Sequence, residues 1–203
     1  KIMKNIKRRF FIKSSSLIAG GLVLPSFKIE RMANNVNNKK LKVSVIGCGG
    51  RGTGAAVQAL RADDNVELIA MADAFEDRLE NSLAAIKEEM DGEKTIDVKE
   101  KNRFTGFNGY KKAIDLADVV ILATPPGFRP LHFKYAIDND KHVFMEKPVA
   151  TDANGVRQVL KTAKNAQQKK LNVVVGLQRR YQFSYLNILK QVRRGVIGKI
   201  TSG

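Results

Sequence analysis

The sequence has a single cysteine and no apolar run long enough to cross a membrane. With Cys48 alone, an intrachain disulfide is excluded, and cysteine usage carries no information about the redox compartment. The apolar run within residues 14–25 is about half the roughly 20 residues that a transmembrane helix needs, so we expect no membrane span in the mature protein. Aromatic residues interleaved with basic ones, which stack on nucleic-acid bases, are also lacking.

Positive charge is abundant but unevenly distributed. The net charge is +16, and nine of these charges come from residues 1–40, where ten Lys or Arg face only Glu30. The other bases are scattered over stretches that we expect to be helical, such as residues 161–170. This favours a solvated helix face over a nucleic-acid site. The hydrophobic content of 43% and charged content of 28% are ordinary for a globular protein, and one main domain is expected.

Residues 1–40 have the pattern of an export leader. Arg8-Arg9-Phe10-Phe11-Ile12-Lys13 matches the twin-arginine motif, and a short apolar run follows at once. We therefore expect recognition by the twin-arginine export machinery and a periplasmic location. Because no clear small-x-small cleavage site precedes Lys39, an uncleaved, membrane-anchored leader remains an alternative.

From Leu41 onward, short apolar runs alternate with amphipathic stretches, which predicts βαβ units. The fold class is α/β, a Rossmann-type doubly wound parallel sheet with helices on both faces. The predicted strands are 42–46, 66–72, 103–104, 118–124, 142–146 and 172–177, and the predicted helices are 53–61, 75–90, 109–116, 131–138, 152–168 and 185–194. Residues 91–102 are expected to form an exposed loop, and the alternation over 195–200 suggests the start of another strand.

The segment from Gly47 to Gly52, called the glycine loop below, matches G-x-G-x-x-G between a predicted strand and a predicted helix. Gly47 would allow the tight turn, Gly49 would let the backbone approach a pyrophosphate, and Gly52 would allow close helix–strand packing. Gly50 and Arg51 complete the loop, and the following helix N-terminus offers N–H groups and partial positive charge to the phosphates. The loop therefore predicts a dinucleotide site.

Asp73 follows the second strand, 21 residues after Gly52, where a carboxylate accepts hydrogen bonds from the ribose hydroxyls of the adenosine. A carboxylate there repels a 2′-phosphate, and the nearest arginine, Arg78, lies five residues further on. The expected cofactor is NAD rather than NADP. We expect no metal site.

Two more segments follow strands at the same predicted edge, where open α/β sheets bind ligands. Thr124-Pro125-Pro126 ends one, and Glu146-Lys147-Pro148 ends the other. As an alternative without a binding role, the prolines would only end the strand, and Glu146 and Lys147 would form an exposed ion pair. Their position favours a role in cofactor binding.

These motifs together resemble the family of glucose-fructose oxidoreductase, inositol dehydrogenase and the rhizopine-catabolism protein MocA. The resemblance extends from about Leu41 to Ile200 and includes Phe104–Phe107 and Gly176–Tyr181. Glu146-Lys147-Pro148 is its most diagnostic element. Some exported members of that family also carry a twin-arginine leader.

The resemblance implies roles for individual residues. Lys147 would be the active-site lysine, beside the nicotinamide and hydrogen-bonded to the substrate hydroxyl that loses hydride. Glu146 and His132 would line the cofactor site, and Arg179 with Arg180 would contribute to substrate binding where a second domain begins. The Asp that many members carry soon after the arginine pair is replaced by Gln182.

We therefore expect a leader over 1–40, the Rossmann domain over 41–178, and over 179–203 the start of a truncated C-terminal domain that would supply an Asp and a His to catalysis. The predicted activity is NAD-dependent hydride transfer to or from a hydroxyl of a small sugar or cyclitol. An exported NAD-dependent glycosidase that works by oxidation, elimination and reduction is an alternative, as is a non-catalytic dinucleotide-binding protein. A homo-oligomer formed through the second domain remains open.

Overall fold

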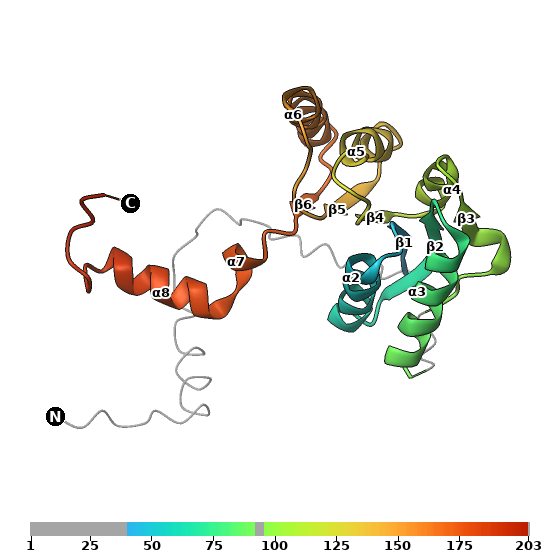
Figure 1. The fold of residues 1–203 in the computed structure, drawn as a ribbon, viewed down its shortest axis with the longest axis horizontal. Coiled ribbons are helices and arrows are strands. Elements are labelled where there is room, and N and C mark those ends of the chain that lie inside the picture. The colour runs from blue at the N-terminus through green and yellow to red at the C-terminus, as the bar shows by residue number, and fades with distance from the viewer. Residues whose placement is uncertain (1–39, 92–95, 203) are drawn as a thin grey trace, which may run out of the picture. The chain divides into compact units, whose positions relative to one another are not determined.

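The computed structural model describes residues 40–91 and 96–202. Within them the chain forms one six-stranded sheet in the order β3-β2-β1-β4-β5-β6 (Figure 1), in which every neighbouring pair is parallel. The strands are β1 (Leu41–Ile46), β2 (Val66–Asp73), β3 (Arg103–Thr105), β4 (Val119–Leu122), β5 (His142–Met145) and β6 (Val173–Val175). This is the doubly wound order, and it confirms the predicted fold class.

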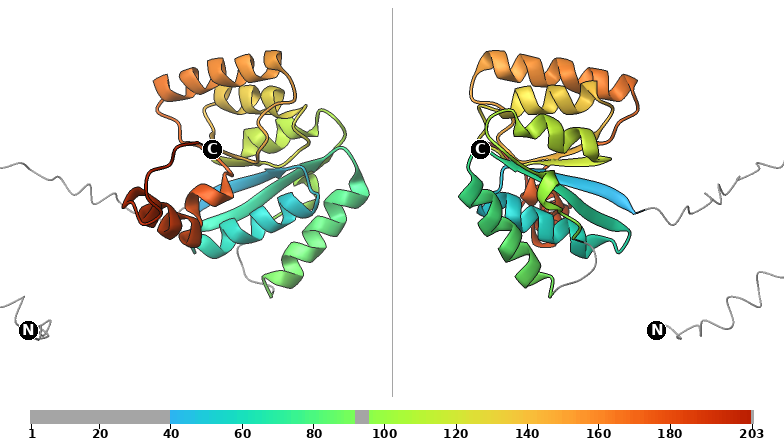
Figure 2. Two further views of the ribbon diagram at one scale, coloured as in Figure 1. Left: turned by 60° about the vertical axis from the view of Figure 1, so that its left-hand side comes forward. Right: turned by 90° about the vertical axis from the view of Figure 1, so that its right-hand side faces the viewer.

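Helices cover both faces of the sheet because the strands are apolar on both sides. Figures 1 and 2 show α2 (Gly50–Ala62) and α3 (Glu76–Glu89) on one face. The other face carries α4 (Gly109–Leu116), α5 (Arg129–Asp138) and α6 (Ala153–Gln168). Each face of the sheet has its own hydrophobic core, and successive side chains of β1 point to opposite faces. Val45 packs in the core with α2 and α3, and Ile46 packs in the core with α4, α5 and α6.

Two of the helices that cover the sheet begin earlier than predicted. α2 begins at Gly50 rather than Thr53, and α5 begins at Arg129 rather than Leu131. The first residues of a helix need no intrahelical partner for their N–H groups, so the glycine loop and Pro130 are tolerated there. The start of α2 therefore lies inside the glycine loop.

The second half of the loop predicted for 91–102 is exposed at Asp97 and at Lys99, Glu100 and Lys101, as predicted, but it also makes contacts with β2 that were not predicted. Ile96 bridges Leu68 of β2, Val98 is buried, and the Asn102 amide donates to the Ile69 carbonyl at 3.0 Å. A short 3-10 helix, η1 (Glu100–Asn102), then leads into β3. On the side of β2 away from β1, β3 is only three residues long and pairs with the end of β2 alone. The segment before β3 contacts β2 on that side at Leu68 and Ile69.

After β6 the chain forms α7 (Gln178–Tyr181) and α8 (Phe183–Arg193), neither of which has a buried residue. The helix predicted over 185–194 is therefore confirmed, although it begins two residues earlier, and the single turn of α7 was not predicted. No strand occupies 195–200 in the described residues. Gly195 and Gly198 have φ angles of 81° and 77°, which are turn conformations.

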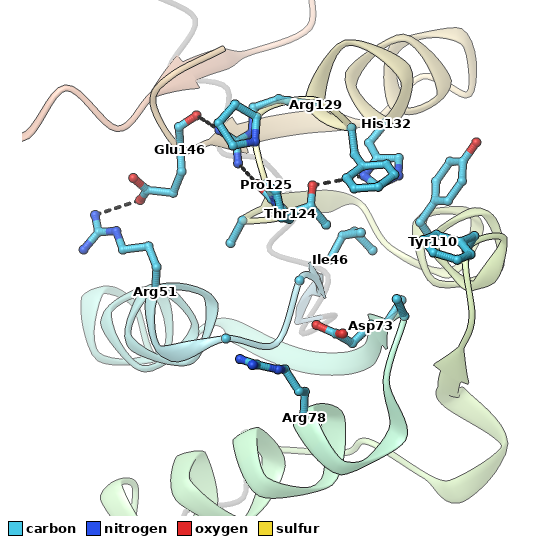
Figure 3. Close-up of a pocket in the computed structure, with 18 of the residues that line it drawn as sticks. Ile46, Arg51, Asp73, Arg78, Tyr110, Thr124, Pro125, Arg129, His132 and Glu146 are labelled. Carbon is cyan, nitrogen blue, oxygen red and sulfur yellow. Dashed lines mark hydrogen bonds and ion pairs between the residues drawn. The ribbon is translucent and has the colours of Figure 1, made fainter. Parts of the chain in front are cut away.

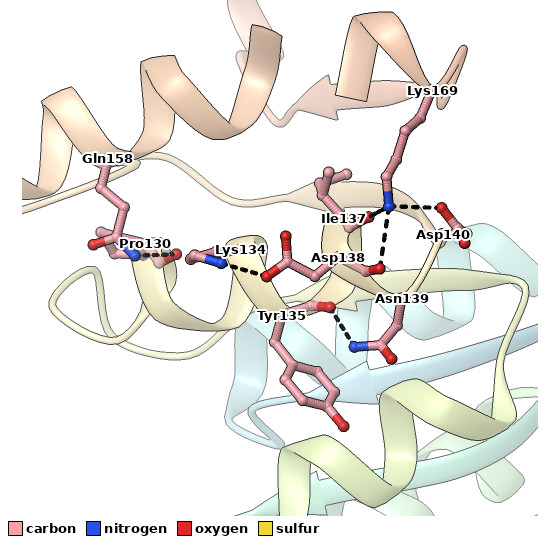
Figure 4. A network of polar contacts seen from close by, with 9 residues as sticks. All are labelled: Pro130, Lys134, Tyr135, Ile137, Asp138, Asn139, Asp140, Gln158 and Lys169. Carbon is pink, nitrogen blue, oxygen red and sulfur yellow. Dashed lines mark hydrogen bonds and ion pairs between the residues drawn. The ribbon is translucent and has the colours of Figure 1, made fainter. Parts of the chain in front are cut away.

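A polar network ties α6 to the C-terminal end of α5 (Figure 4). The Lys169 ammonium donates to the carbonyls of Ile137 and Asp138 at 2.9 and 3.1 Å and contacts the Asp140 carboxylate at 2.7 Å. Carbonyls at a helix C-terminus lack intrahelical donors, and the ammonium satisfies two of them. The two helices are thereby held together away from the carboxyl edge of the sheet.

No helix in the described part of the chain is long and apolar enough to span a membrane. The leader predicted for residues 1–40 lies, except for Lys40, outside the described residues.

Candidate functional site

A cavity of about 600 Å³ opens at the carboxyl ends of β1, β2, β4 and β5, where the strand order reverses between β1 and β4 (Figure 3). This is the edge at which open α/β sheets bind ligands. Most of the residues predicted for the cofactor site line it together: Gly47, Gly49, Arg51, Asp73, Thr124, Pro125, Pro126, His132, Glu146 and Lys147.

The glycine loop has the geometry expected of each glycine. Gly47 has a φ of 96°, and a Cβ there would lie 2.5 Å from the Thr124 nitrogen. A Cβ on Gly52 would lie 1.9 Å from the Gly47 carbonyl oxygen, so only glycine permits this close contact between α2 and the turn after β1. Gly50 and Gly52 do not line the cavity: Gly50 is the exposed first residue of α2, and Gly52 is buried.

The N-terminus of α2 suits an anion. Its N-cap, Gly49, has no side chain to bond the first N–H groups, and no acidic residue occupies the first turn. Space is open in front of Gly49, with no atom within 4 Å of a Cβ built there. The uncapped N–H groups and the partial positive charge of the helix fit a pyrophosphate that approaches over Gly49.

Asp73 lies at the end of β2 and is also tied to the glycine loop. One carboxylate oxygen accepts from the Cys48 N–H at 2.6 Å, and the other accepts from the Phe75 N–H at 3.1 Å. Each oxygen retains a lone pair for a ribose hydroxyl. The two backbone bonds therefore hold the carboxylate in place at the mouth of the cavity.

Arg78 enters the same cavity from the first turns of α3, and Figure 3 shows it near Asp73. The sequence places it five residues after Asp73, a spacing that brings it back over the strand end once a helix begins at Glu76. Arg78 was noted in the sequence but not predicted as a site residue.

Glu146 is a buried carboxylate at the opposite end of the cavity. Its side chain is 5% exposed, and one oxygen lies 2.7 Å from Nη2 of Arg51, which is half exposed on α2. The contact lacks the direction of a hydrogen bond, because Oε1 of Glu146 has no hydrogen-bond donor. Gly176, which belongs to the resemblance but was not predicted as a site residue, packs against the carboxylate: a Cβ there would lie 2.9 Å from Oε2.

His132 stands in a row of rings along the cavity wall. Its ring lies 4.1 Å from that of Tyr110 and 6.0 Å from that of Phe128, and Phe128 lies 6.1 Å from Phe107. Nδ1 of His132 is 3.2 Å from the Thr124 hydroxyl. Burial, and secondly the positive charge of Arg129, lower the pKa of His132 to about 4, so the imidazole is neutral near pH 7.

Arg129, the first residue of α5, was also missed. It is 2% exposed, and its guanidinium is bonded to the carbonyl oxygens of Thr124, Glu146 and Pro148 (Figure 3). Lys147, between the last two of these, has an exposed side chain on the cavity, and its peptide bond to Pro148 is cis. Burial lowers the pKa of Arg129, and the Glu146 carboxylate opposes that shift.

Three other residues do not line the cavity. Arg179 and Arg180 are in α7 and do not line the cavity, and the Arg179 guanidinium lies 5.4 Å over the ring of Tyr185. Their predicted substrate role stays a prediction. Cys48 is buried, and burial together with Asp73 raises the pKa of its thiol to about 12, which rules it out as a nucleophile near neutral pH.

Solved structures of known proteins share this fold. Myo-inositol 2-dehydrogenase from Lactobacillus plantarum is 29% identical, with a TM-score of 0.64 over 80% of this chain and 43% of that chain. A 3-ketoreductase from Actinomadura kijaniata, solved in complex with TDP-benzene and NADP, has the same fold, with 24% identity and a TM-score of 0.60 over 80% of this chain and 45% of that chain.

A curated relative is the alpha-N-acetylgalactosaminidase of Shewanella oneidensis, 26% identical over an alignment of 223 positions that covers 99% of this chain and 46% of that protein. The chain thus spans about half the length of the curated relatives that it matches. Residues 41–176, from β1 through β6, match the oxidoreductase family with an NAD-binding Rossmann fold. The chain belongs to this family, named for glucose-fructose oxidoreductase, inositol dehydrogenase and MocA.

Proposed function

We propose that the chain forms the dinucleotide-binding part of an oxidoreductase that moves hydride between NAD and a secondary hydroxyl of a sugar or cyclitol. One observation carries the proposal. A single cavity joins Asp73 and the glycine loop at one end to Glu146 and Lys147 at the other. Adenosine-binding and proton-handling groups therefore share one continuous surface.

The residues of this surface divide the work of binding. The N–H groups at the start of α2 hold the pyrophosphate, and the Asp73 carboxylate accepts hydrogen bonds from the adenosine ribose. Thr124, Pro125 and Pro126 form the middle wall, and Glu146 lies at the nicotinamide end. The bound nicotinamide supplies the hydride acceptor or donor.

Lys147 acts on the substrate hydroxyl. Its ammonium is a mobile donor that hydrogen-bonds the hydroxyl oxygen, and its neutral amine accepts the hydroxyl proton as hydride leaves the carbon. His132 does not share this task, because its buried ring stays neutral and bonds Thr124. An Asp and a His from a second domain would complete the acid–base set.

NAD is the proposed cofactor, in preference to NADP. The Asp73 carboxylate, anchored by two N–H groups, repels a 2′-phosphate at the position of the ribose. Arg78 lines the same cavity and offers a 2′-phosphate partial compensation. We therefore expect measurable but weaker NADP binding.

The test replaces Lys147. In the full-length protein, Lys147→Ala should lower turnover by roughly two to four powers of ten, the usual effect of losing a general acid–base group. NAD affinity should change far less, because phosphate recognition rests on backbone N–H groups. Lys164→Ala, at an exposed position of α6, is the control. Near-normal turnover in Lys147→Ala would instead reject the catalytic role of Lys147.

An NAD-dependent glycosidase is the second candidate, favoured by the similarity over the whole chain to an alpha-N-acetylgalactosaminidase. Such an enzyme oxidises a ring hydroxyl, eliminates the aglycone and reduces the ring again, so it uses the same lysine. Product analysis on an aryl glycoside separates the two. Release of the aglycone without net change in NADH absorbance indicates the glycosidase, and net NADH formation indicates the dehydrogenase.

We also propose that residues 1–40 direct export through the twin-arginine route to the periplasm. The support is Arg8-Arg9-Phe10-Phe11-Ile12-Lys13 followed by a short apolar run. That route carries folded proteins, which suits an enzyme that takes up a dinucleotide in the cytoplasm.

A further inference from the structure

Arg129 is a buried cation to which neither the family resemblance nor the proposed mechanism gives a role. It begins α5 and is among the largest fully buried side chains, with 2% exposure. No carboxylate forms an ion pair with it among the described residues. Burying an ion is costly unless hydrogen bonds satisfy it, so the bonds that Arg129 makes explain why it is there.

Those bonds converge on the segment that carries Lys147. Nη1 donates to the Glu146 carbonyl at 2.5 Å and to the Pro148 carbonyl at 2.6 Å, one on each side of Lys147. Nη2 donates to the Thr124 carbonyl at the end of β4. One guanidinium therefore joins the segments that follow two neighbouring strands.

Arginine suits this position. The planar guanidinium presents several N–H donors in a fixed geometry, whereas a lysine ammonium is a point charge on a flexible stem. The guanidinium therefore holds three carbonyls from two segments in one defined arrangement, which a flexible ammonium would define less tightly. The Nε of Arg129 has no hydrogen-bond partner among the described residues, so the two terminal nitrogens make all of these bonds: Nη1 bonds the carbonyls that flank Lys147, and Nη2 bonds the Thr124 carbonyl.

The consequence concerns the direction of the Lys147 side chain. Lys147 is exposed on the cavity, and its side chain makes no hydrogen bond or ion pair among the described residues. A long, flexible side chain is aimed chiefly by the backbone from which it projects. Fixing the carbonyls before and after Lys147 fixes that backbone.

We propose that Arg129 is a positioning residue, which holds the backbone on both sides of Lys147 and thereby aims its ammonium into the cofactor cavity. The proposal rests on the proposed function, since it assumes that NAD binds there beside Lys147. Arg129 itself touches neither cofactor nor substrate in this assignment.

The test uses Arg129→Met, Arg129→Lys and Arg129→Gln in the 203-residue chain. Arg103→Met is the control, because Arg103 is a partly buried arginine that bonds Glu80, at 3.2 and 3.4 Å, and does not line the cavity. NAD affinity is measured by calorimetry. Acetylation of Lys147 by acetic anhydride is followed residue by residue by mass spectrometry, with and without saturating NAD, well below the melting temperature of each variant.

In the unaltered chain, bound NAD should slow acetylation of Lys147 by about fivefold or more, because the ammonium is held beside the cofactor. Arg129→Met and Arg129→Gln should reduce this protection to less than about twofold while NAD affinity changes by less than about threefold, since phosphate binding uses the α2 amides. Arg129→Lys should be intermediate, and Arg103→Met should behave as the unaltered chain. If Arg129→Met does not fold, the Lys and Gln variants decide the question.

The outcomes separate the two claims. A residue that only stabilises the fold would lower the melting temperature and leave the protection of Lys147 unchanged. Full protection in folded Arg129 variants therefore overturns the positioning role and leaves the proposed function standing. If the unaltered chain binds no NAD, or binds it without protecting Lys147, the proposed function fails and the positioning role fails with it.

Discussion

Asp73 combines two tasks in one carboxylate. It anchors the glycine loop through the Cys48 N–H and the start of α3 through the Phe75 N–H, and it faces the cavity beside Arg78. Hydrogen bonds to an ionised acceptor are stronger than those between neutral groups, so the carboxylate holds the glycine loop in place and also offers acceptors to a ligand. Replacing Asp73 should therefore affect both the affinity for NAD and the discrimination between NAD and NADP.

Asp73→Ser should lower the ratio of NAD affinity to NADP affinity by about tenfold, equivalent to about 1.4 kcal/mol. NAD loses a carboxylate acceptor, whereas NADP loses a repulsive charge and keeps Arg78. Calorimetric titration of both cofactors measures the change, with the exposed Asp64→Ser as control. Equal affinity for the two cofactors in the unaltered protein would contradict the predicted preference.

His132 predicts a specific dependence of stability on pH. Its pKa is about 4 in the folded protein and about 6.5 in the unfolded chain, so between these values the unfolded state binds more protons. The stability due to the neutral ring is present above pH 6.5 and is lost as pH falls toward 4, by at most about 3 kcal/mol.

Urea unfolding of the unaltered chain and of His132→Gln between pH 7 and pH 4 measures this contribution. Gln keeps a polar group near Thr124 and does not titrate. The difference in unfolding free energy between the two proteins should shrink as the pH falls. A difference that is constant with pH would show that His132 is not the titrating group.

Helix α2 shows how one element serves both folding and binding. It begins inside the glycine loop, where Gly52 packs directly on the Gly47 carbonyl, while Gly54, one residue beyond Thr53, faces open space. A side chain is therefore excluded at Gly52, whereas there is room for one at Gly54 in the same helix.

Gly52→Ala should destabilise the chain by at least about 2 kcal/mol and abolish NAD binding, because the new methyl group separates α2 from the loop. Gly54→Ala should stabilise it by about 0.5–1 kcal/mol, through higher helix propensity and a less flexible unfolded chain, with NAD affinity retained. Chemical denaturation and NAD titration of the pair measure both effects. Similar destabilisation by the two substitutions would argue against the close contact at Gly52.

For the whole molecule, the leader prediction is independent of the Rossmann fold. A reporter fused to residues 1–40 should reach the periplasm, and replacement of Arg8 and Arg9 together by Lys should keep it in the cytoplasm. Lysine retains the charge but not the planar group that a receptor recognises. Lys4 and Lys7, each changed to Arg, provide the control. Unchanged export of the double Lys variant would count against the twin-arginine route.

Patterns confined to one stretch of chain were sufficient for much of the fold. Alternating apolar runs predicted six strands near their true positions, because burial on both faces of a parallel sheet leaves a continuous apolar signature. The glycine loop and Asp73 were found for the same reason: a tight turn, a helix start and a strand end are local requirements. The carboxyl ends of parallel strands share one edge, so the gathering of Thr124 and Glu146 there also followed from sequence.

Tertiary structure alone decided the contacts between segments. Arg129 bonds carbonyls that lie 17 and 19 residues away, Arg51 pairs with Glu146 across the cavity, and Gly176 is glycine because a carboxylate from another strand lies above it. The sequence contains no periodic or local signal for such partners. These contacts depend on the order of the strands and on the distances between neighbouring helices. Both are determined by the packing of the whole core.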